Sequence, residues 1–200
     1  MRTLLALAGS LLLLPLATAH AQVPRPPGTR TSLELMGGNH ALQLRYLSPS
    51  PFAQVGNSDL DYGFLLSENR DIVGSAALMF HTHLHLLPRL TLDVGPQGYL
   101  ALLSDIRKTD VFAVALGASA RYGIVPRWHV SLFGSAFYSP GVLTFGSADD
   151  LYDLTAGARM RFTRHLAGLA GYRWLKFTTS GEPSVYVQNE VFVGLAWKLR

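Results

Sequence analysis

The sequence contains no cysteine, which excludes a disulfide framework and a thiolate metal centre. Charged residues are also scarce, because they make up 15% of the chain against about 25% in an average soluble domain. Beyond residue 21, no apolar run reaches the roughly 18 residues that a transmembrane helix needs. An apolar chain of this kind either buries its side chains in a core or turns them toward lipid as a β-barrel.

A large excess of positive charge is missing as well. The 17 lysines and arginines face 13 acidic residues, and the cations are scattered, so the sequence does not predict nucleic-acid binding. No glycine-rich motif has the spacing that cradles phosphates, which argues against a nucleotide cofactor. His129 and Ser131 could form a base and a nucleophile, but no acid is placed beside them. We therefore predict a protein that is not an enzyme and has no cofactor.

The N-terminus has the pattern of a secretory signal peptide. A basic start at Arg2 precedes the apolar stretch 4–16, and small residues at positions 17, 19 and 21 fit the small-x-small cleavage rule. We expect a signal peptide over 1–21, a proline-rich leader over 22–30, and one domain over 31–200.

Large apolar residues alternate with small or charged residues along the rest of the chain, as in 112–122 and 191–199. The second face is rich in Gly, Ala and Ser with widely spaced Arg, which fits a narrow lumen better than a solvated outer face. The predicted strands span 31–36, 40–47, 59–67, 72–86, 90–103, 111–122, 128–138, 151–162, 166–177 and 185–199.

The connections between these strands alternate in length. Short turns at 87–89, 125–127 and 163–165 alternate with longer polar connections at 104–110, 139–150 and 178–183. This alternation is typical of outer-membrane barrels, whose short turns lie on the periplasmic side. We predict an all-β fold, a transmembrane antiparallel up-and-down barrel of about ten strands, located in the outer membrane. Eight strands are the alternative, because the connection over 48–57 is long where a short turn is expected.

Four short motifs follow one another between about residues 110 and 176. They are Ser-Leu-Phe-Gly at 131–134, Tyr-Ser-Pro at 138–140, Ala-Gly-Ala-Arg at 156–159 and Ala-Gly-Tyr-Arg at 170–173. In order and spacing they resemble the YfaZ family of small outer-membrane proteins of Gram-negative bacteria. The resemblance implies a β-barrel in the outer membrane and carries over no catalytic residues.

The end of the chain, Gly194-x-x-Trp197-x-Leu199, resembles the C-terminal signal of outer-membrane barrels. It implies the barrel-assembly machinery as a partner, beside outer-membrane lipid, for a barrel that we expect to be monomeric. The expected function is structural, or the passage of small solutes through a largely filled, charged lumen. The alternative is a soluble periplasmic lipocalin-like barrel, whose apolar faces would point inward to a ligand.

Charged residues on the small-residue face are the candidate lumen residues. They predict an ion-pair network that fills the barrel, with an anion-selective pore as the rival interpretation. Asp93 and Glu190 are the acids that we expect to pair with the arginines. The predicted lumen-facing residues are His81, His83, His85, Arg45, Asp93, Arg121, Arg159, Arg173 and Glu190.

The three histidines occupy every second position of 80–86. Alternate residues of a strand lie about 7 Å apart, whereas zinc ligands lie about 2 Å from the ion. All three can hardly share one metal, so a site would need His83 and His85 with ligands from neighbouring strands. We expect no metal here, but a row of polar side chains that gain charge near pH 6 to 6.5.

Tyrosines and tryptophans near the predicted strand ends are expected to form belts at the two membrane interfaces. The predicted belt residues are Tyr99, Tyr122, Trp128, Tyr138, Tyr152, Tyr172, Trp174 and Trp197.

Overall fold

The structure is a computed structural model that describes residues 31–50, 58–83, 89–104, 109–125, 129–179 and 184–199. The predicted signal peptide and leader lie outside these residues, as do His85, Trp128 and most of the turns predicted at 87–89 and 125–127. Within the described residues, no helix is long and apolar enough to cross a membrane.

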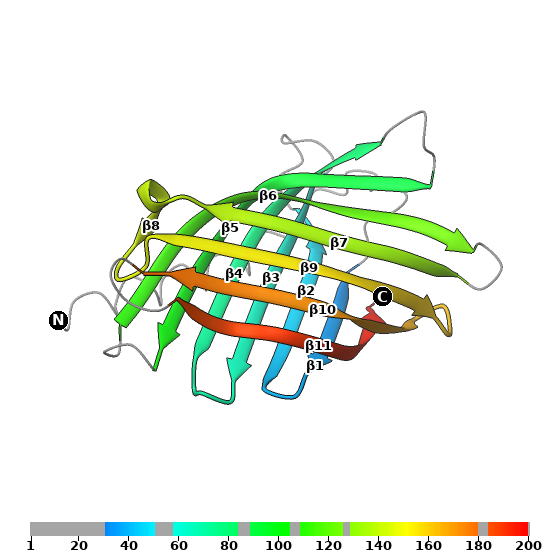
Figure 1. Ribbon diagram of the computed structural model, residues 1–200. Helices are drawn as coiled ribbons and strands as arrows, with labels where there is room; N and C mark the ends of the chain where they lie inside the picture. The colour runs from blue at the N-terminus through cyan, green and yellow to red at the C-terminus, as the bar shows by residue number, and fades with distance from the viewer. Residues whose placement is uncertain are drawn as a thin grey trace, which may run out of the picture.

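The described residues form eleven strands and one short 3₁₀ turn (Figure 1). The long strands are β1 (Ser32–Gly37), β2 (Ala41–Pro49), β3 (Ser58–Ser67), β4 (Ile72–His83), β5 (Leu90–Leu103), β6 (Thr109–Val125), β7 (Val130–Ser139), β9 (Asp150–Arg161), β10 (Leu166–Thr178) and β11 (Val185–Lys198). The connection after β7 carries the 3₁₀ turn η3 (Gly141–Leu143) and the two-residue strand β8 (Thr144–Phe145).

Ten of these strands close into a barrel. Each long strand pairs antiparallel with its neighbour in the chain, β7 pairing with β9. The first strand, β1, pairs with the last, β11, so the ring has no free edge. The short β8 lies beyond the end of β7 and pairs with Phe112 and Ala113 of β6. The prediction of an antiparallel barrel of ten strands is therefore confirmed, and the alternative of eight strands is excluded.

The predicted strands agree with the observed ones within a few residues. The largest difference is at β6, which extends from Thr109 to Val125 rather than from 111 to 122, and the predicted end of β4 at 84–86 lies outside the described residues. The connection at 139–150 was expected to be a plain loop, but it contains η3 and β8. Thr144 holds this segment against the barrel, because its hydroxyl hydrogen-bonds the Ser139 hydroxyl at 2.9 Å.

The antiparallel order gives the barrel two different ends. We call the end with the connections at 38–40, 68–71 and 140–149 the loop end, and the end with the connection at 162–165 the turn end. Because the number of strands is even, Ser32 at the start of β1 and Lys198 at the end of β11 are both at the turn end, where they pair.

Side chains alternate between the two faces of the wall. On β1, Leu33 and Leu35 expose 37% and 50% of their surface, whereas Glu34 and Met36, which alternate with them, each expose 5%. The same pattern of exposed apolar and buried partners runs through β2, β9 and β11. The large apolar face points away from the barrel axis, as the sequence predicted for a membrane barrel and contrary to the lipocalin-like alternative.

The interior is not uniform along the axis. At the loop end, apolar side chains of mixed size fill it and are almost fully buried, a feature that the sequence analysis did not predict for an inside of small and charged residues. We call this cluster the apolar plug. Its members are Leu65, Val73, Ala77, Met79, Tyr99, Ala101, Leu103, Val111, Ala113, Ala115, Phe137, Ala148, Leu151, Leu175, Phe177, Val185 and Val187.

Candidate functional site: a charged cavity inside the barrel

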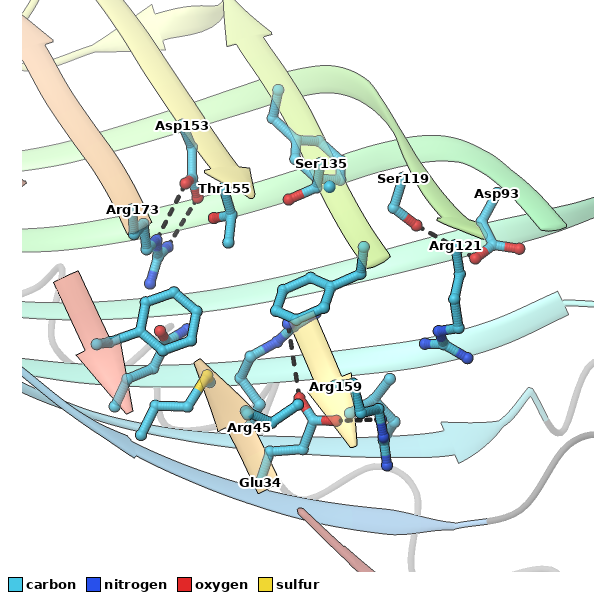
Figure 2. Close-up of a pocket in the computed structure, with 18 of the residues that line it drawn as sticks. Glu34, Arg45, Asp93, Ser119, Arg121, Ser135, Asp153, Thr155, Arg159 and Arg173 are labelled. Atoms are coloured by element: carbon cyan, nitrogen blue, oxygen red, sulfur yellow. Dashed lines mark hydrogen bonds and ion pairs between the residues drawn. The ribbon is translucent and has the colours of Figure 1, made fainter. Parts of the chain in front are cut away.

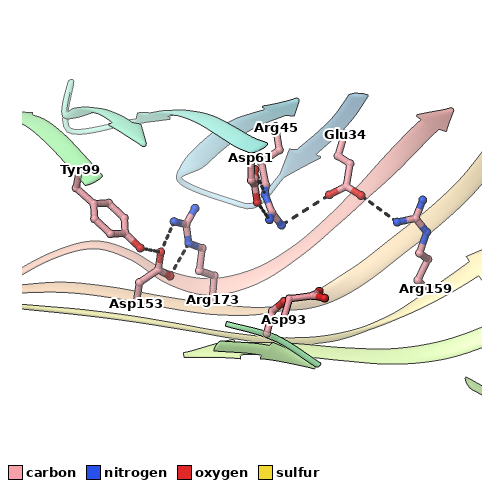
Figure 3. A network of polar contacts seen from close by, with 9 residues as sticks. Glu34, Arg45, Asp61, Asp93, Tyr99, Asp153, Arg159 and Arg173 are labelled. Atoms are coloured by element: carbon pink, nitrogen blue, oxygen red, sulfur yellow. Dashed lines mark hydrogen bonds and ion pairs between the residues drawn. The ribbon is translucent and has the colours of Figure 1, made fainter. Parts of the chain in front are cut away.

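Below the apolar plug, the interior carries charged side chains in contact with one another (Figure 3). Glu34 of β1 lies between Arg45, its partner on the adjacent strand, and Arg159, which is three strands away in the other direction. Its Oε1 is 3.0 Å from Nη1 of Arg159 on β9, and its Oε2 is 3.7 Å from Nη1 of Arg45 on β2. Arg45 also forms an ion pair with Asp61 on the adjacent strand β3. These four residues link one side of the barrel to the other.

A second ion pair lies deeper, against the apolar plug. Arg173 on β10 donates from Nε and Nη2 to the two carboxylate oxygens of Asp153 on β9, at 3.0 and 2.7 Å. The phenol of Tyr99, from the opposite wall, donates to the same carboxylate at 2.8 Å. The side chains of Arg173 and Asp153 expose 7% and 6% of their surface, so this bidentate pair is nearly removed from solvent.

His81 lies between two carboxylates. Its Nδ1 is 2.5 Å from Asp93 Oδ1, and its Nε2 is 2.9 Å from Asp59 Oδ2. Asp93 is the residue directly opposite His81 on β5, and it also accepts a hydrogen bond from the Ser119 hydroxyl at 3.2 Å. The sequence analysis placed no acid beside the histidines, because the register between the two strands was unknown.

The structure describes less of the other two histidines, His83 and His85. His83 is the last residue of β4 and has the same parity as His81, but its side chain and the whole of His85 lie outside the described residues. Among the described residues, no group of three or more His, Asp or Glu side chains is arranged to hold a metal ion.

Glu190 points inward, but it serves a turn rather than an arginine. Its Oε2 accepts the backbone N–H of His40 at 2.8 Å. A Cβ on Gly38 would lie 2.3 Å from its Oε1, so a larger residue at this position would displace the carboxylate. The expectation that Asp93 and Glu190 pair with the arginines is therefore corrected.

The acids that do pair with the arginines are Glu34, Asp61 and Asp153. The sequence did contain a signal for them, because each lies at inward parity. Asp153 is six residues before Arg159 on the same strand, and Glu34 separates the outward Leu33 and Leu35. Applying the alternation along the whole of each strand would have included all three.

The charged residues surround a cavity of about 80 Å³ (Figure 2). Its lining combines four arginines, three acids and several small polar residues. Arg121 of β6 also lines it, and it is exposed although it has inward parity. In the part of the chain that the structure describes, no carboxylate forms an ion pair with Arg121. The charged lining residues are Arg45, Arg121, Arg159, Arg173, Glu34, Asp93 and Asp153.

Two glycines make room for the cavity's aromatic wall. Across four neighbouring strands, Phe133, Gly157, Gly171 and Phe192 are successive partners in register. A Cβ on Gly157 would lie 2.7 Å from Cζ of Phe133, and one on Gly171 would lie 2.8 Å from Cζ of Phe192. The two rings therefore lie over the glycines, with their centroids 6.5 Å apart.

The same glycines belong to the motifs Ala-Gly-Ala-Arg and Ala-Gly-Tyr-Arg. In each motif the glycine lies beneath a phenylalanine, and the arginine two residues later points to the same inner face. Arg159 and Arg173 are those arginines. The two motifs thus build one aromatic wall and two of the cations that line the cavity.

Most of the predicted belt residues face outward. Near the loop end, Tyr152 lies between Tyr138 and Trp174, with ring centroids 4.9 and 6.2 Å away. Toward the turn end, Tyr122 and Trp197 expose 43% and 60% of their surface. The prediction for Tyr99 is wrong, because this residue is 1% exposed and points into the barrel toward Asp153.

The fold and its interior define a closed antiparallel barrel of ten strands with an apolar exterior and a charged, largely filled inside. The sequence profile of the YfaZ family, described as YfaZ precursor, matches residues 63–199. The chain therefore belongs to the YfaZ family, which confirms the resemblance drawn from the motifs of the second half.

Two solved structures align with most of this chain. A bacterial polysaccharide outer membrane secretin aligns with a TM-score of 0.46 and 14% identity over 82% of this chain, and the chain spans 58% of the secretin chain. The KdgM porin in complex with disordered oligogalacturonate aligns with a TM-score of 0.42 and 10% identity, over 85% of this chain and 99% of the porin. The comparison with curated protein sequences finds no match.

Proposed function

We propose that this protein is an integral outer-membrane barrel with a structural function and a lumen closed to solutes. The observation that carries the proposal is the exterior. Large apolar side chains are exposed on nine of the ten barrel strands, and Leu116, Val191, Val193 and Trp197 expose between 60% and 65% of their surface. Contiguous apolar patches on soluble monomers rarely exceed a few hundred Å², whereas lipid-facing barrels carry such a band all round.

The aromatic residues support the same proposal. Trp and Tyr are favoured where hydrocarbon meets the headgroups, and here they face outward near both ends of the barrel. The strands β4 to β11, apart from β8, have 10 to 17 residues, which meets the roughly 9–11 residues of a membrane-spanning strand.

The closed lumen follows from the inside of the loop end. Tyr99, Ala101, Val111, Leu151 and Phe177 in the apolar plug expose at most 1% of their surface, which supports an interior that is packed rather than filled with water at this level. Barrels of about eight strands are just filled by their own side chains, and in this barrel of ten strands the described interior holds a cavity of about 80 Å³ below the plug. A structural function therefore fits this interior better than solute passage.

The pairing of the terminal strands supports two further parts of the proposal. Residues 32–37 of β1 pair with residues 193–198 of β11, so closure of the barrel requires the C-terminal strand. We expect the barrel-assembly machinery to act on this strand and the closed barrel to be a monomer. Crosslinking of a probe placed at Leu195 to the assembly machinery, and sedimentation of the purified barrel, would test the two parts separately.

The membrane location is tested by fractionation and by gel migration. We expect the protein to remain with outer membranes after carbonate extraction, and to migrate faster in detergent gels before heating than after heating. Release by carbonate or by salt alone would contradict the membrane location and favour the soluble barrel.

Planar-bilayer recording tests the closed lumen. We expect no resolved conductance steps from the purified barrel at any voltage that leaves the bilayer intact, with a general porin as the positive control. Reproducible anion-selective steps would contradict the closed lumen and favour the pore interpretation.

A further inference from the structure

We propose that the cavity is a binding site for a small oxyanion of the phosphate or carboxylate type, held between Arg121 and Arg159 and reached from the turn end. The proposal rests on the inner surface of the barrel alone, so it holds for the purified protein whether or not the membrane location is correct.

Arg121 supplies the first reason. It has inward parity on β6, lines the cavity and remains exposed. The other three arginines of the lining each contact a carboxylate: Arg45 contacts Asp61 and Glu34, Arg159 contacts Glu34, and Arg173 contacts Asp153. The carboxylate of Asp93 is near enough to interact with Arg121 electrostatically, but it is already held by His81 and Ser119.

Arg159 supplies the second reason. It donates to Glu34 from Nη1, and Glu34 divides its charge between this arginine and Arg45. Within the described residues, Nε and Nη2 of Arg159 have no other acceptor. Two of its donors are therefore available to a ligand, and its charge is only partly balanced.

The two cations face the same space. In the register, Arg121 of β6 is opposite Phe133 of β7, and Phe133 is opposite Gly157 of β9, two residues before Arg159. The two arginines thus flank β7 on the inner wall, where their like charges are unfavourable to each other. Figure 2 shows both side chains among the residues that line the cavity. An anion between them would replace this repulsion by two attractions.

The shape of the site limits the size of the ligand. A water molecule needs about 10–15 Å³ of cavity volume. A cavity of about 80 Å³ therefore holds several waters, or one small ion with part of its hydration shell. Ligand pockets for larger organic molecules are typically about 300–1,000 Å³. A compact oxyanion fits the cavity, and a sugar chain or a lipid does not.

The exposure of the lining shows the side of entry. Side-chain exposure rises from 6% and 7% at Asp153 and Arg173, through 16% at Arg159, to the exposed Arg121. The plug closes the loop end, so the cavity is blind and opens toward the turn end. In a barrel with both termini on the periplasmic side, this opening faces the periplasm.

The guanidinium groups favour an oxyanion over chloride. Each presents planar, paired N–H donors that match two oxygens of a carboxylate or phosphate, and a spherical halide cannot use this geometry. The hydroxyls of Ser135 and Thr155 also line the cavity, and they can donate to oxygens that the arginines do not reach.

The test uses the purified barrel in detergent and inorganic phosphate as the probe. We measure the midpoint of urea unfolding in phosphate and in chloride at equal ionic strength. Because a ligand of the native state stabilises it by mass action, phosphate is expected to raise the wild-type midpoint above that in chloride. The Arg121→Gln variant should lose this difference, whereas Arg89→Gln, in an exposed turn outside the cavity, should keep it.

A direct measurement separates binding from general salt effects. The ³¹P resonance of phosphate should broaden with wild-type protein and with Arg89→Gln, and stay sharp with Arg121→Gln. Equal midpoints in phosphate and chloride, or equal broadening with Arg121→Gln, would overturn the proposal. Heat-dependent gel migration shows whether each variant is folded. If Arg121→Gln does not fold, Arg121→Lys replaces it, and phosphate binding unchanged from that of the wild type would overturn the site.

Acetate and citrate in place of phosphate then distinguish the two kinds of oxyanion. The outcome is separate from that of the proposed function, because membrane fractionation and bilayer recording do not depend on the cavity.

Discussion

Arg173 and Asp153 form an ion pair that is almost fully removed from solvent, with Tyr99 as a third partner. Such a pair adds little stability over an apolar replacement, but the loss of one partner leaves the other charge buried and unpaired. The pair therefore contributes mainly to a unique arrangement of side chains at the base of the apolar plug, and little to the stability of the barrel.

We expect Arg173→Met to lower the free energy of unfolding by about 3–5 kcal/mol, because Asp153 is left without its cation. The triple change Arg173→Met, Asp153→Leu and Tyr99→Phe should cost much less, because it removes all three polar partners together. Urea titration of the refolded barrel measures both effects. Arg164→Met, in the exposed turn at 162–165, is the control and should leave the midpoint unchanged. Equal losses in the single and triple variants would contradict this account.

His40 makes a different kind of ion pair, in the exposed turn at the loop end. Its Nδ1 is 2.5 Å from Glu68 Oε2, and both side chains are largely exposed. The hydrogen bond and charge of Glu68 raise the pKa of His40 above its usual value of about 6.5, with a smaller contribution from Glu190. Because the folded-state pKa is raised, the pair stabilises the protein fully below about pH 6.5 and loses this effect as the pH rises through the folded-state pKa.

The stability difference between the wild type and Glu68→Gln is therefore expected to be small, largest at acidic pH, and to vanish at alkaline pH. NMR titration of the His40 ring should show its pKa falling toward 6.5 in Glu68→Gln. A difference that grows as the pH rises would contradict the assigned direction.

Sequence parity was a good guide to single residues. It placed Arg45, Arg121, Arg159 and Arg173 on the inner face, where the structure has them. It did not identify their partners, because contacts across strands depend on register, and register is not visible in one strand. Tyr99 shows the other weakness, since a belt was inferred from residue type and position rather than from its parity with Ala101.

The strands β7, β9, β10 and β11 share a row in which two glycines lie beneath two phenylalanines. Neither glycine is needed for an unusual backbone angle. Each is needed because a neighbouring strand and an aromatic ring occupy the place of its side chain. The glycine in each of the two motifs is thus required by the packing of the adjacent strands.

Gly171→Ala is expected to destabilise the barrel by about 1–3 kcal/mol, the usual cost of overpacking. Its Cβ would lie 2.5 Å from the Ala156 carbonyl oxygen and 2.8 Å from Cζ of Phe192. Gly123→Ala is the matched control, because nothing lies within 4 Å of its Cβ, and it should be neutral or slightly stabilising. Urea unfolding of both variants measures the contrast, and equal effects would show that the glycines matter for another reason.

The last strand, β11, contains a β-bulge that alternation in the sequence could not predict. Opposite Leu175 and Lys176, the register of β11 shifts at a β-bulge, so Val187 and Gln188 are both buried. Strict alternation from Val191 would have turned Val187 outward. Strand positions follow from local alternation, but a bulge depends on the neighbouring strand and leaves no clear mark in the sequence.

For the molecule as a whole, the sequence predicted the closed antiparallel barrel, its ten strands and the direction of its apolar face. It did not predict that the inside differs from end to end. The residues of the apolar plug come from nearly every strand and lie far apart in the chain, so only closure of the ring brings them together. Inward residues such as Ala113 and Ala115 are small, and the sequence analysis therefore assigned them to a narrow, charged lumen rather than to an apolar cluster.

The apolar plug has a consequence for how the barrel opens. On β6, the backbone near Val111 and Ala113 is dry on its inner side, whereas that near Ser119 and Arg121 faces the cavity, and both stretches are paired with β5. Amide hydrogens of the first stretch should exchange with solvent more slowly than those of the second. Deuterium uptake followed by mass spectrometry would then vary along each strand rather than between strands. We therefore expect the strands to separate first at the turn end, while they stay paired at the loop end.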